Sequence, residues 1–138
     1  MLRRLPGILL AALLLVSVSG CSSSGREQSR ILQTLATRAS ALNTRNMSQY
    51  LTVVSTQYSD KGKSFVQLRE SLEKNFRDFE QIAYEQGTPT ITVDGSTAGA
   101  VCSYRMKVRV RGKEMTLNGT EHLRLVKELE GWKIIAGI

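Results

Sequence analysis

The chain has 138 residues, a formal net charge of +7 and hydrophobic residues at 41% of its positions. That length suits one domain, which can build a single core without covalent staples. Two cysteines and one histidine are too few for a disulfide framework or a clustered metal site, so the sequence predicts neither a metal nor another cofactor.

The N-terminus has the order of a secretory signal. A basic start at Arg3 and Arg4 precedes the apolar run of residues 8–16, and small residues lie between this run and Cys21. The apolar run is shorter than the roughly 18 residues expected of a membrane-spanning helix. We therefore predict that residues 1–20 are a signal peptide, removed on export.

The tetrapeptide Val18-Ser19-Gly20-Cys21 resembles the lipobox of bacterial lipoproteins. The resemblance implies a diacylglyceryl group on Cys21, cleavage just before it and acylation of the new amine. Ser22, where an Asp tends to retain such proteins in the inner membrane, implies the outer membrane, facing the periplasm. Residues 21–29 are expected to be the lipidated cysteine and a flexible tether. The anchor makes the membrane a partner, and export separates the protein from nucleic acid.

Three helices are predicted next. The first begins at the cap Ser29 and has an apolar stripe at helical spacing: Ile31, Leu35, Ala39 and Leu42. Asn46 caps a second helix, and Asp60-Lys61-Gly62 then makes a turn. Ser64 and Gln67 form a capping box that opens a third helix with the most apolar stripe of the chain: Phe65, Leu68, Leu72, Phe76 and Phe79.

From about residue 80 the hydrophobic period changes to two, which predicts an antiparallel meander of strands. A turn at Arg111-Gly112 sets the register of two long strands, with these pairs facing each other: Val108 and Met115, Met106 and Leu117, Tyr104 and Gly119, Cys102 and Glu121. A turn at Glu130-Gly131 likewise predicts the pairs Leu129 with Trp132, and Leu125 with Ala136. We expect Leu72, Phe76, Leu117 and Trp132 in one core.

Helices followed by a meander predict an α+β fold, with three N-terminal helices on one face of a curved antiparallel sheet. Residues 30–138 resemble the nuclear transport factor 2-like superfamily, which includes polyketide-cyclase-like and ketosteroid-isomerase-like domains. The segments that carry the resemblance are Tyr58-Ser59-Asp60, residues 93–98, residues 123–128 and residues 131–134. The resemblance implies a cone-like roll with an internal pocket, and dimers through the outer sheet face.

Glu121 is the most informative single residue, because its phase places it on the inner, apolar face of the sheet. A carboxylate there is costly unless it is paired or lines a wet pocket. It is either a general acid or base, with Tyr104 as its partner, or a structural group bonded to Tyr104 or to a helix. We favour the structural interpretation and assign no catalytic residue. The pocket candidates are Tyr58, Cys102, Tyr104, Glu121 and Trp132, and Cys102 is expected to be buried as a small apolar residue.

The outer sheet face combines charge with a small apolar patch. A basic stripe of Arg105, Lys107, Arg109 and Arg111 is expected to be solvated. Val126 and Ile135, predicted to pair on the same face, would form the centre of a homodimer interface.

Two functions follow from these observations. The first is an envelope-anchored lipoprotein whose periplasmic domain is a non-catalytic module for a small apolar ligand or a protein partner. The alternative is a small pocket enzyme, isomerase- or hydrolase-like, that uses Glu121 and Tyr104 as its acid–base pair.

Overall fold

The computed structural model describes residues 21–138, and the predicted signal peptide, residues 1–20, lies outside this range. In chain order the elements are α1 (Cys21–Thr44), α2 (Met47–Leu51), β1 (Ser59–Asp60), β2 (Lys63–Ser64), α3 (Phe65–Asp78), β3 (Gln81–Gln86), β4 (Thr90–Asp94), β5 (Thr97–Val110), β6 (Lys113–Glu128) and β7 (Gly131–Ala136). No helix of the described residues is long and apolar enough to span a membrane.

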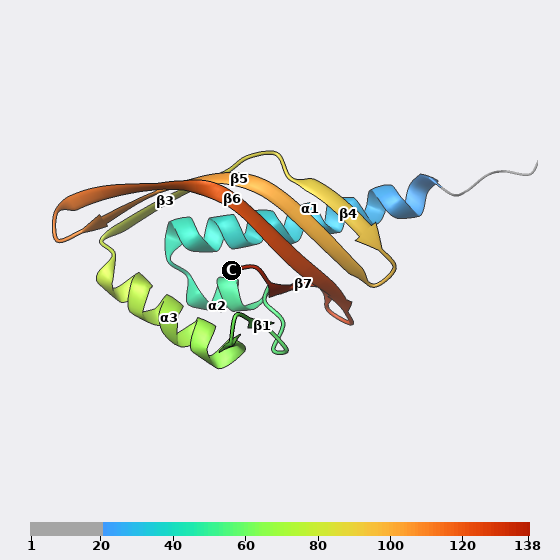
Figure 1. The fold of residues 1–138 in the computed structure, drawn as a ribbon, viewed down its shortest axis with the longest axis horizontal. Coiled ribbons are helices and arrows are strands. Elements are labelled where there is room, and N and C mark those ends of the chain that lie inside the picture. The colour runs from blue at the N-terminus through green and yellow to red at the C-terminus, as the bar shows by residue number, and fades with distance from the viewer. Residues whose placement is uncertain (1–20) are drawn as a thin grey trace, which may run out of the picture.

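A curved antiparallel sheet covers the helices. Its order is β3-β5-β6-β7, and β4 pairs with the same edge of β5 beyond the end of β3. The sheet arches over α1 without closing, and α2 and α3 lie beyond α1 (Figure 1). The predicted α+β fold of helices followed by a curved antiparallel sheet is confirmed. The short hairpin β1–β2 between α2 and α3 is an addition to it.

Helix α1 begins earlier than the sequence predicts. It starts at Cys21, so the segment predicted to be a flexible tether is its first turns. Tertiary contacts hold this part of the helix: the Glu27 carboxylate accepts hydrogen bonds from Lys127 Nζ at 2.7 Å and from Trp132 Nε1 at 2.6 Å. These contacts with the β6–β7 hairpin override the weak helix propensity of the serines and glycine around them.

The two other helices begin where their caps predict. Asn46 accepts a hydrogen bond from Gln49 N at 3.0 Å and caps α2. The capping box of α3 is complete, because Ser64 Oγ accepts from Gln67 N at 3.3 Å and Gln67 Oε1 accepts from Ser64 N at 2.8 Å. Each side chain thereby satisfies a backbone donor that the helix itself leaves free.

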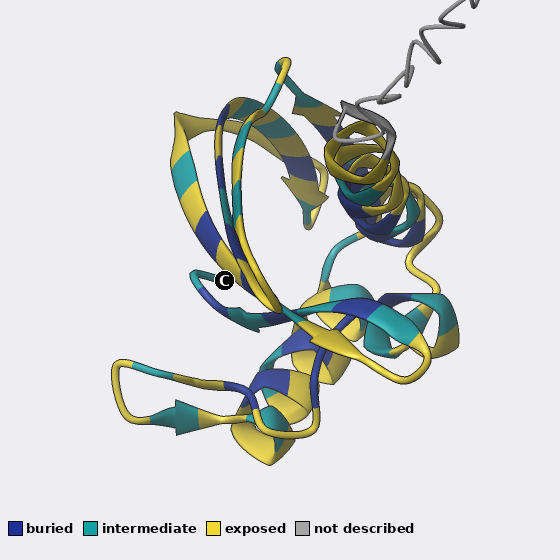
Figure 2. Ribbon diagram, turned by 90° about the vertical axis from the view of Figure 1, so that its right-hand side faces the viewer, coloured by how far each residue is buried: buried dark blue, intermediate teal, exposed yellow. Residues whose placement is uncertain are grey.

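The predicted register of β5 and β6 is confirmed. Arg111 and Gly112 have φ of 51° and 75°, which forms the two-residue turn expected in a hairpin. Cys102 faces Glu121 and Tyr104 faces Gly119, as the alternation of the sequence requires. Along β5 the more buried residues alternate with exposed ones, whereas in β6 this alternation begins only at Glu121 and residues 113–120 are all exposed (Figure 2). The basic side chains of the outer stripe are exposed.

The predicted register of β6 and β7 is wrong by two residues, because the turn lies one residue earlier than expected. The turn consists of Leu129 and Glu130, so Trp132 faces Lys127 and Leu125 faces Ile134. Leu129 is fully exposed at the tip, and an irregularity between Arg124 and Leu125 shifts the pairing by one residue, so that Arg124 faces Ala136. Leu129, which the sequence predicts in the strand, therefore lies in the turn, and Gly131, predicted in the turn, begins β7.

This register also changes the basis of the dimer prediction. Val126 pairs with Lys133 and not with Ile135, so the expected apolar pair on the outer face does not form. A homodimer through that face stays a prediction without the patch that motivated it.

The core consists of two clusters on either side of α1's midpoint. One joins the C-terminal part of α1 to α2, α3 and β3, and includes Leu42, Leu72 and Tyr84. The other joins Ile31 and Leu35 to β5, β6 and β7, and includes Trp132. Trp132 and Leu72 therefore lie in different clusters, and Leu117 is 47% exposed because no helix covers that part of β6. The prediction of one core that contains all of them is wrong.

Candidate functional site

A cavity of about 190 Å³ lies between the sheet, α1 and α3, and we call it the inner cavity. Side chains from three helices and three strands line it. Its wall is mostly apolar, and six of the apolar residues are Leu42, Leu72, Phe76, Phe79, Ile82 and Met106. Six polar side chains also reach it: Arg38, Tyr50, Asn75, Tyr84, Tyr104 and Glu121. An apolar hollow with a few convergent polar groups is the usual form of a small-molecule site.

An ion pair between Arg38 of α1 and Glu121 of β6 forms the polar part of the wall. Arg38 Nη1 donates to Glu121 Oε2 at 2.9 Å, and Nη2 donates to Oε1 at 3.0 Å. The two side chains are 6% and 13% exposed. This bidentate geometry is the strong form of an arginine–carboxylate pair, and burial of the pair is tolerable because both charges are also hydrogen-bonded.

Two tyrosines complete the network. Arg38 Nε donates to Tyr50 Oη at 3.1 Å, and Nη1 also donates to Tyr84 Oη at 3.2 Å. Tyr84 in turn donates to Glu121 Oε2 at 2.8 Å. Burial raises the pKa of Tyr84, and Glu121 adds to this effect, so its hydroxyl stays a neutral donor. Burial acts to lower the pKa of Arg38, but Tyr50, Glu121 and Tyr84 outweigh it, and the guanidinium stays charged.

Tyr104 occupies the cavity wall beside this network. Its ring stacks on Tyr84 with the centroids 6.2 Å apart. The ring lies directly over Gly119, where a Cβ atom would come within 2.9 Å of its carbon atoms. Glycine at this position is therefore what lets the ring lie flat against β6. Within residues 21–138 the Tyr104 hydroxyl has no hydrogen-bond partner, so it is a free polar group of the cavity.

A second hollow of about 580 Å³, which we call the rim groove, adjoins the inner cavity. It runs over the edge of β6 that β7 leaves uncovered, between that edge, the β1–β2 hairpin and the residues after β7. The two hollows share four residues: Arg38, Tyr104, Glu121 and Ile138. The rim groove is therefore the polar entrance to the inner cavity.

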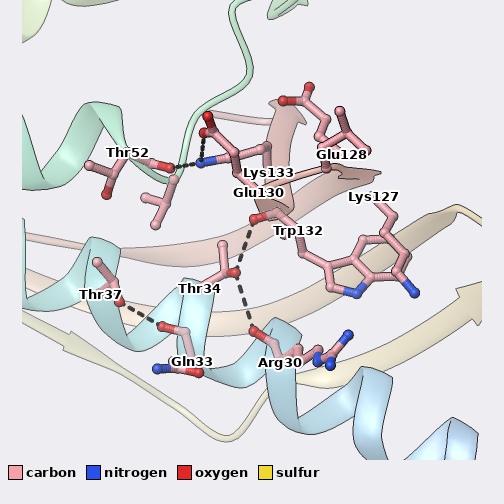
Figure 3. Close-up of a pocket in the computed structure, with 13 residues that line it drawn as sticks. Arg30, Gln33, Thr34, Thr37, Thr52, Lys127, Glu128, Glu130, Trp132 and Lys133 are labelled. Carbon is pink, nitrogen blue, oxygen red and sulfur yellow. Dashed lines mark hydrogen bonds and ion pairs between the residues drawn. The ribbon is translucent and has the colours of Figure 1, made fainter.

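A third hollow, about 590 Å³, lies between α1 and the β6–β7 hairpin (Figure 3). Its polar atoms bond to one another: Thr34 Oγ1 donates to the carbonyl oxygens of Trp132 at 3.1 Å and of Arg30 at 3.2 Å. Lys133 bonds the carbonyl oxygen of Thr52 and pairs with Glu130 at 3.6 Å. These bonds join α1 to the hairpin and leave few free groups for a ligand, so we do not place the site here.

The structure brings only two of the pocket candidates into the inner cavity, Tyr104 and Glu121. Tyr58 is buried elsewhere, where its hydroxyl donates to Ile138 O at 3.0 Å. Cys102 is buried, as expected, and its Sγ accepts from Gln86 Nε2 at 3.1 Å. Burial raises the pKa of the Cys102 thiol, which keeps it protonated. Trp132 lies in the other core cluster, at the third hollow.

Sequence reasoning missed Arg38, Tyr50 and Tyr84 as members of the site. The signal for Arg38 was present: it lies three residues after Leu35 and four before Leu42, on the buried stripe of α1. A base on a buried stripe and an acid on the inner face of the sheet each need a partner of opposite charge. Considered together, they would have predicted the ion pair.

Within residues 21–138, no three His, Cys, Asp or Glu side chains gather closely enough to hold a metal ion. The polar groups of the cavity are a guanidinium, a carboxylate, an amide and phenols. They can orient a ligand by hydrogen bonds.

Comparison with known proteins agrees with this architecture. A family model described as SnoaL-like domain matches residues 50–136, more than half of the chain. No curated protein sequence matches the chain. Solved structures of low sequence identity share the nuclear transport factor 2-like fold, so the likeness among them shows the fold alone.

Three of these structures illustrate how a similar fold accompanies low sequence identity. A Salmonella enterica protein of the nuclear transport factor 2-like superfamily has 17% identity and a TM-score of 0.74, over 84% of this chain and 93% of its own. A provisionally named scytalone dehydratase from Novosphingobium aromaticivorans has 13% identity and a TM-score of 0.75, over 82% of each chain. A Kribbella flavida protein has 11% identity and a TM-score of 0.75, over 83% and 89%.

Proposed function

The chain belongs to the SnoaL-like domain family, and we propose that it is a non-catalytic ligand-binding module, anchored to the bacterial envelope by a lipid on Cys21. The inner cavity is the binding site of this proposal. Its apolar wall suits a ligand with little polar surface, and its volume of about 190 Å³ suits a small one.

The non-catalytic role in this proposal rests on the hydrogen bonds that the Glu121 carboxylate accepts. Both of its oxygens accept hydrogen bonds from Arg38, and one accepts a further bond from Tyr84. A general base must reach the proton that it removes, with a lone pair free to take it. Glu121 could do so only by loosening a buried bidentate pair, which is strongly unfavourable. The carboxylate therefore supports the wall of the cavity, and α1 supplies the helix partner that the structural interpretation required.

The pocket enzyme with Glu121 and Tyr104 as its acid–base pair is the second candidate. One observation favours it: the Tyr104 hydroxyl is free within the described chain and faces the same cavity as Glu121. Fold relatives carry provisional names such as dehydratase. A single phenol can donate a proton, but the step also needs a base, and Glu121 is engaged. We therefore place this function second.

The envelope location rests on the lipobox. Helix α1 begins at Cys21, so in this proposal the lipid would be attached directly to the first turn of a helix that continues into the core. Such a connection would hold the domain close to the bilayer, on the periplasmic side of the outer membrane.

Binding is tested by calorimetric titration of the purified full chain, carrying Cys21→Ser, with 1-octanol in detergent-free buffer. We expect saturable binding. Leu72→Phe, which adds volume at the cavity wall, should abolish it, whereas Val66→Phe, on the exposed face of the same helix, should not. Absence of binding to the parent protein, or unchanged binding to the Leu72→Phe variant, would contradict the proposal.

A further inference from the structure

The inner cavity and the rim groove meet at Arg38, Tyr104, Glu121 and Ile138, but they differ in chemistry. The inner part is lined mainly by aliphatic and aromatic side chains. The outer part is lined by polar and charged side chains from the β1–β2 hairpin and from β6. A ligand that occupied both would need an apolar portion and a polar portion joined end to end.

The acidic groups of the rim groove are already engaged. Glu121 is held by Arg38 and Tyr84, and Asp60 Oδ2 accepts a hydrogen bond from Gly137 N at 3.1 Å. The Ile138 oxygen also accepts a hydrogen bond, from Tyr58. Asp60 forms no ion pair within residues 21–138, so it leaves one negative charge in the groove, whereas the charge of Glu121 is neutralised by Arg38.

Two basic side chains of the groove also have no ion-pair partner in the described chain. Lys61 and Arg124 line the groove, and neither forms an ion pair within residues 21–138. Lys61 has φ of 49° and is followed by Gly62 with φ of 77°, so it lies in a tight two-residue turn whose backbone is well defined. The Tyr104 hydroxyl, free within the same range, adds a donor where the groove meets the cavity. Among the charged groups of the entrance without an ion pair in the described chain, two cations thus outnumber one carboxylate.

We propose that the natural ligand class is a small amphiphile with one anionic headgroup, whose short apolar tail fills the inner cavity while its head lies among Lys61, Arg124 and the Tyr104 hydroxyl. This inference rests on the proposed function, because it needs the inner cavity to be a binding site. It adds the sign of the headgroup's charge and the direction in which the ligand enters the cavity. The head does not contact Arg38 as a charge partner, because Glu121 already neutralises that guanidinium.

The test compares three probes of equal chain length by calorimetry: octanoate, 1-octanol and octylammonium, each titrated into the full chain carrying Cys21→Ser. We expect octanoate to bind about fivefold more tightly than octanol, the effect of one exposed ion pair, and octylammonium to bind more weakly than octanol. Raising the salt concentration should remove the advantage of octanoate and leave octanol unchanged.

The variant Lys61→Gln/Arg124→Gln should bring octanoate to the affinity of octanol without changing octanol binding. Lys63→Gln/Arg105→Gln is the matched control, because it removes two positive charges that do not line the groove. Octanol binding with no preference for octanoate, or a preference that the control also abolishes, would overturn this inference and leave the proposed function intact. Failure of all three probes to bind would overturn the proposed function as well.

Discussion

Glu27 shows how one side chain holds the first turns of α1 against the sheet. Hydrogen bonds from Lys127 and from Trp132 lower the pKa of its carboxyl below the ordinary 4.5. A carboxyl whose pKa is lower in the folded state stabilises that state above its ordinary pKa, and this contribution is lost as the pH falls through the folded value. The contact should therefore persist in mild acid and weaken only below pH 4.5.

Trp132 is the only tryptophan, so its fluorescence reports on this contact. We expect an acid titration to show a change in Trp132 emission with a midpoint below 4.5. Glu27→Gln should remove the transition, and Glu130→Gln, an exposed carboxylate of the same hairpin, should retain it. A midpoint above 4.5, or a transition that survives in Glu27→Gln, would contradict the assignment.

Among single residues, the sequence identified Glu121 but not its partner Arg38. The phase of β6 places Glu121 on the inner face without reference to anything else, since the side-chain period of a strand is two. Arg38 is harder to identify, because a long side chain on a buried stripe normally extends its charge to the surface. Only the folded arrangement, in which α1 crosses β6 at Glu121 and β3 supplies Tyr84, fixes where that charge goes.

The helix caps permit a test at the scale of elements. Ser64 and Gln67 satisfy two backbone groups at the start of α3, the helix that forms one wall of the inner cavity. Ser64→Ala should lower the free energy of unfolding by about 1 kcal/mol, measured by chemical denaturation. Ser71→Ala, inside the same helix, should leave it unchanged or slightly higher, because alanine favours helix. Equal stability of Ser64→Ala and the parent protein would show that the capping box contributes nothing.

The two long hairpins show which registers a sequence can predict. Between β5 and β6, alternation on both strands and a turn with Gly112 at positive φ agree on one register. Between β6 and β7, the apolar Leu129 favours a place in the strand, and Gly131 favours a place in the turn. The structure exposes Leu129 instead and places Gly131 in β7 with φ of 127°. Hydrogen bonds to the hairpin explain this register, because Glu27, Thr34 and Thr52 contact it there.

For the whole molecule, the alternation of periods was sufficient to predict the layers, but not the exposed stretch of β6. Met115 and Leu117 follow the inner-face pattern, yet both side chains are about half exposed. The curvature of the sheet and the lengths of the helices decide this coverage, and neither is a property of local sequence.

The lipid anchor is a prediction about the location of the whole molecule. Cys21→Ser should block lipidation, so the protein should leave the membrane fraction, because stable anchoring needs the diacylglyceryl chains. Cys102→Ala is the matched control at the other cysteine and should fractionate as the unaltered protein does. A Cys21→Ser protein that remains a processed, detergent-extractable membrane species would show that the lipobox resemblance is misleading.

The ion pair between Arg38 and Glu121 joins the helical layer to the sheet, and the central claim is that this pair is structural. The most direct test is a double-mutant cycle on the free energy of unfolding, with Arg38→Met, Glu121→Leu and the double variant. Each single variant leaves one buried charge without its partner and should lose about 3–5 kcal/mol, and the double variant should recover most of that loss. A Glu121→Leu protein as stable as the parent, or more stable, would contradict the account, because it would show that the carboxylate is kept for chemistry at the expense of stability.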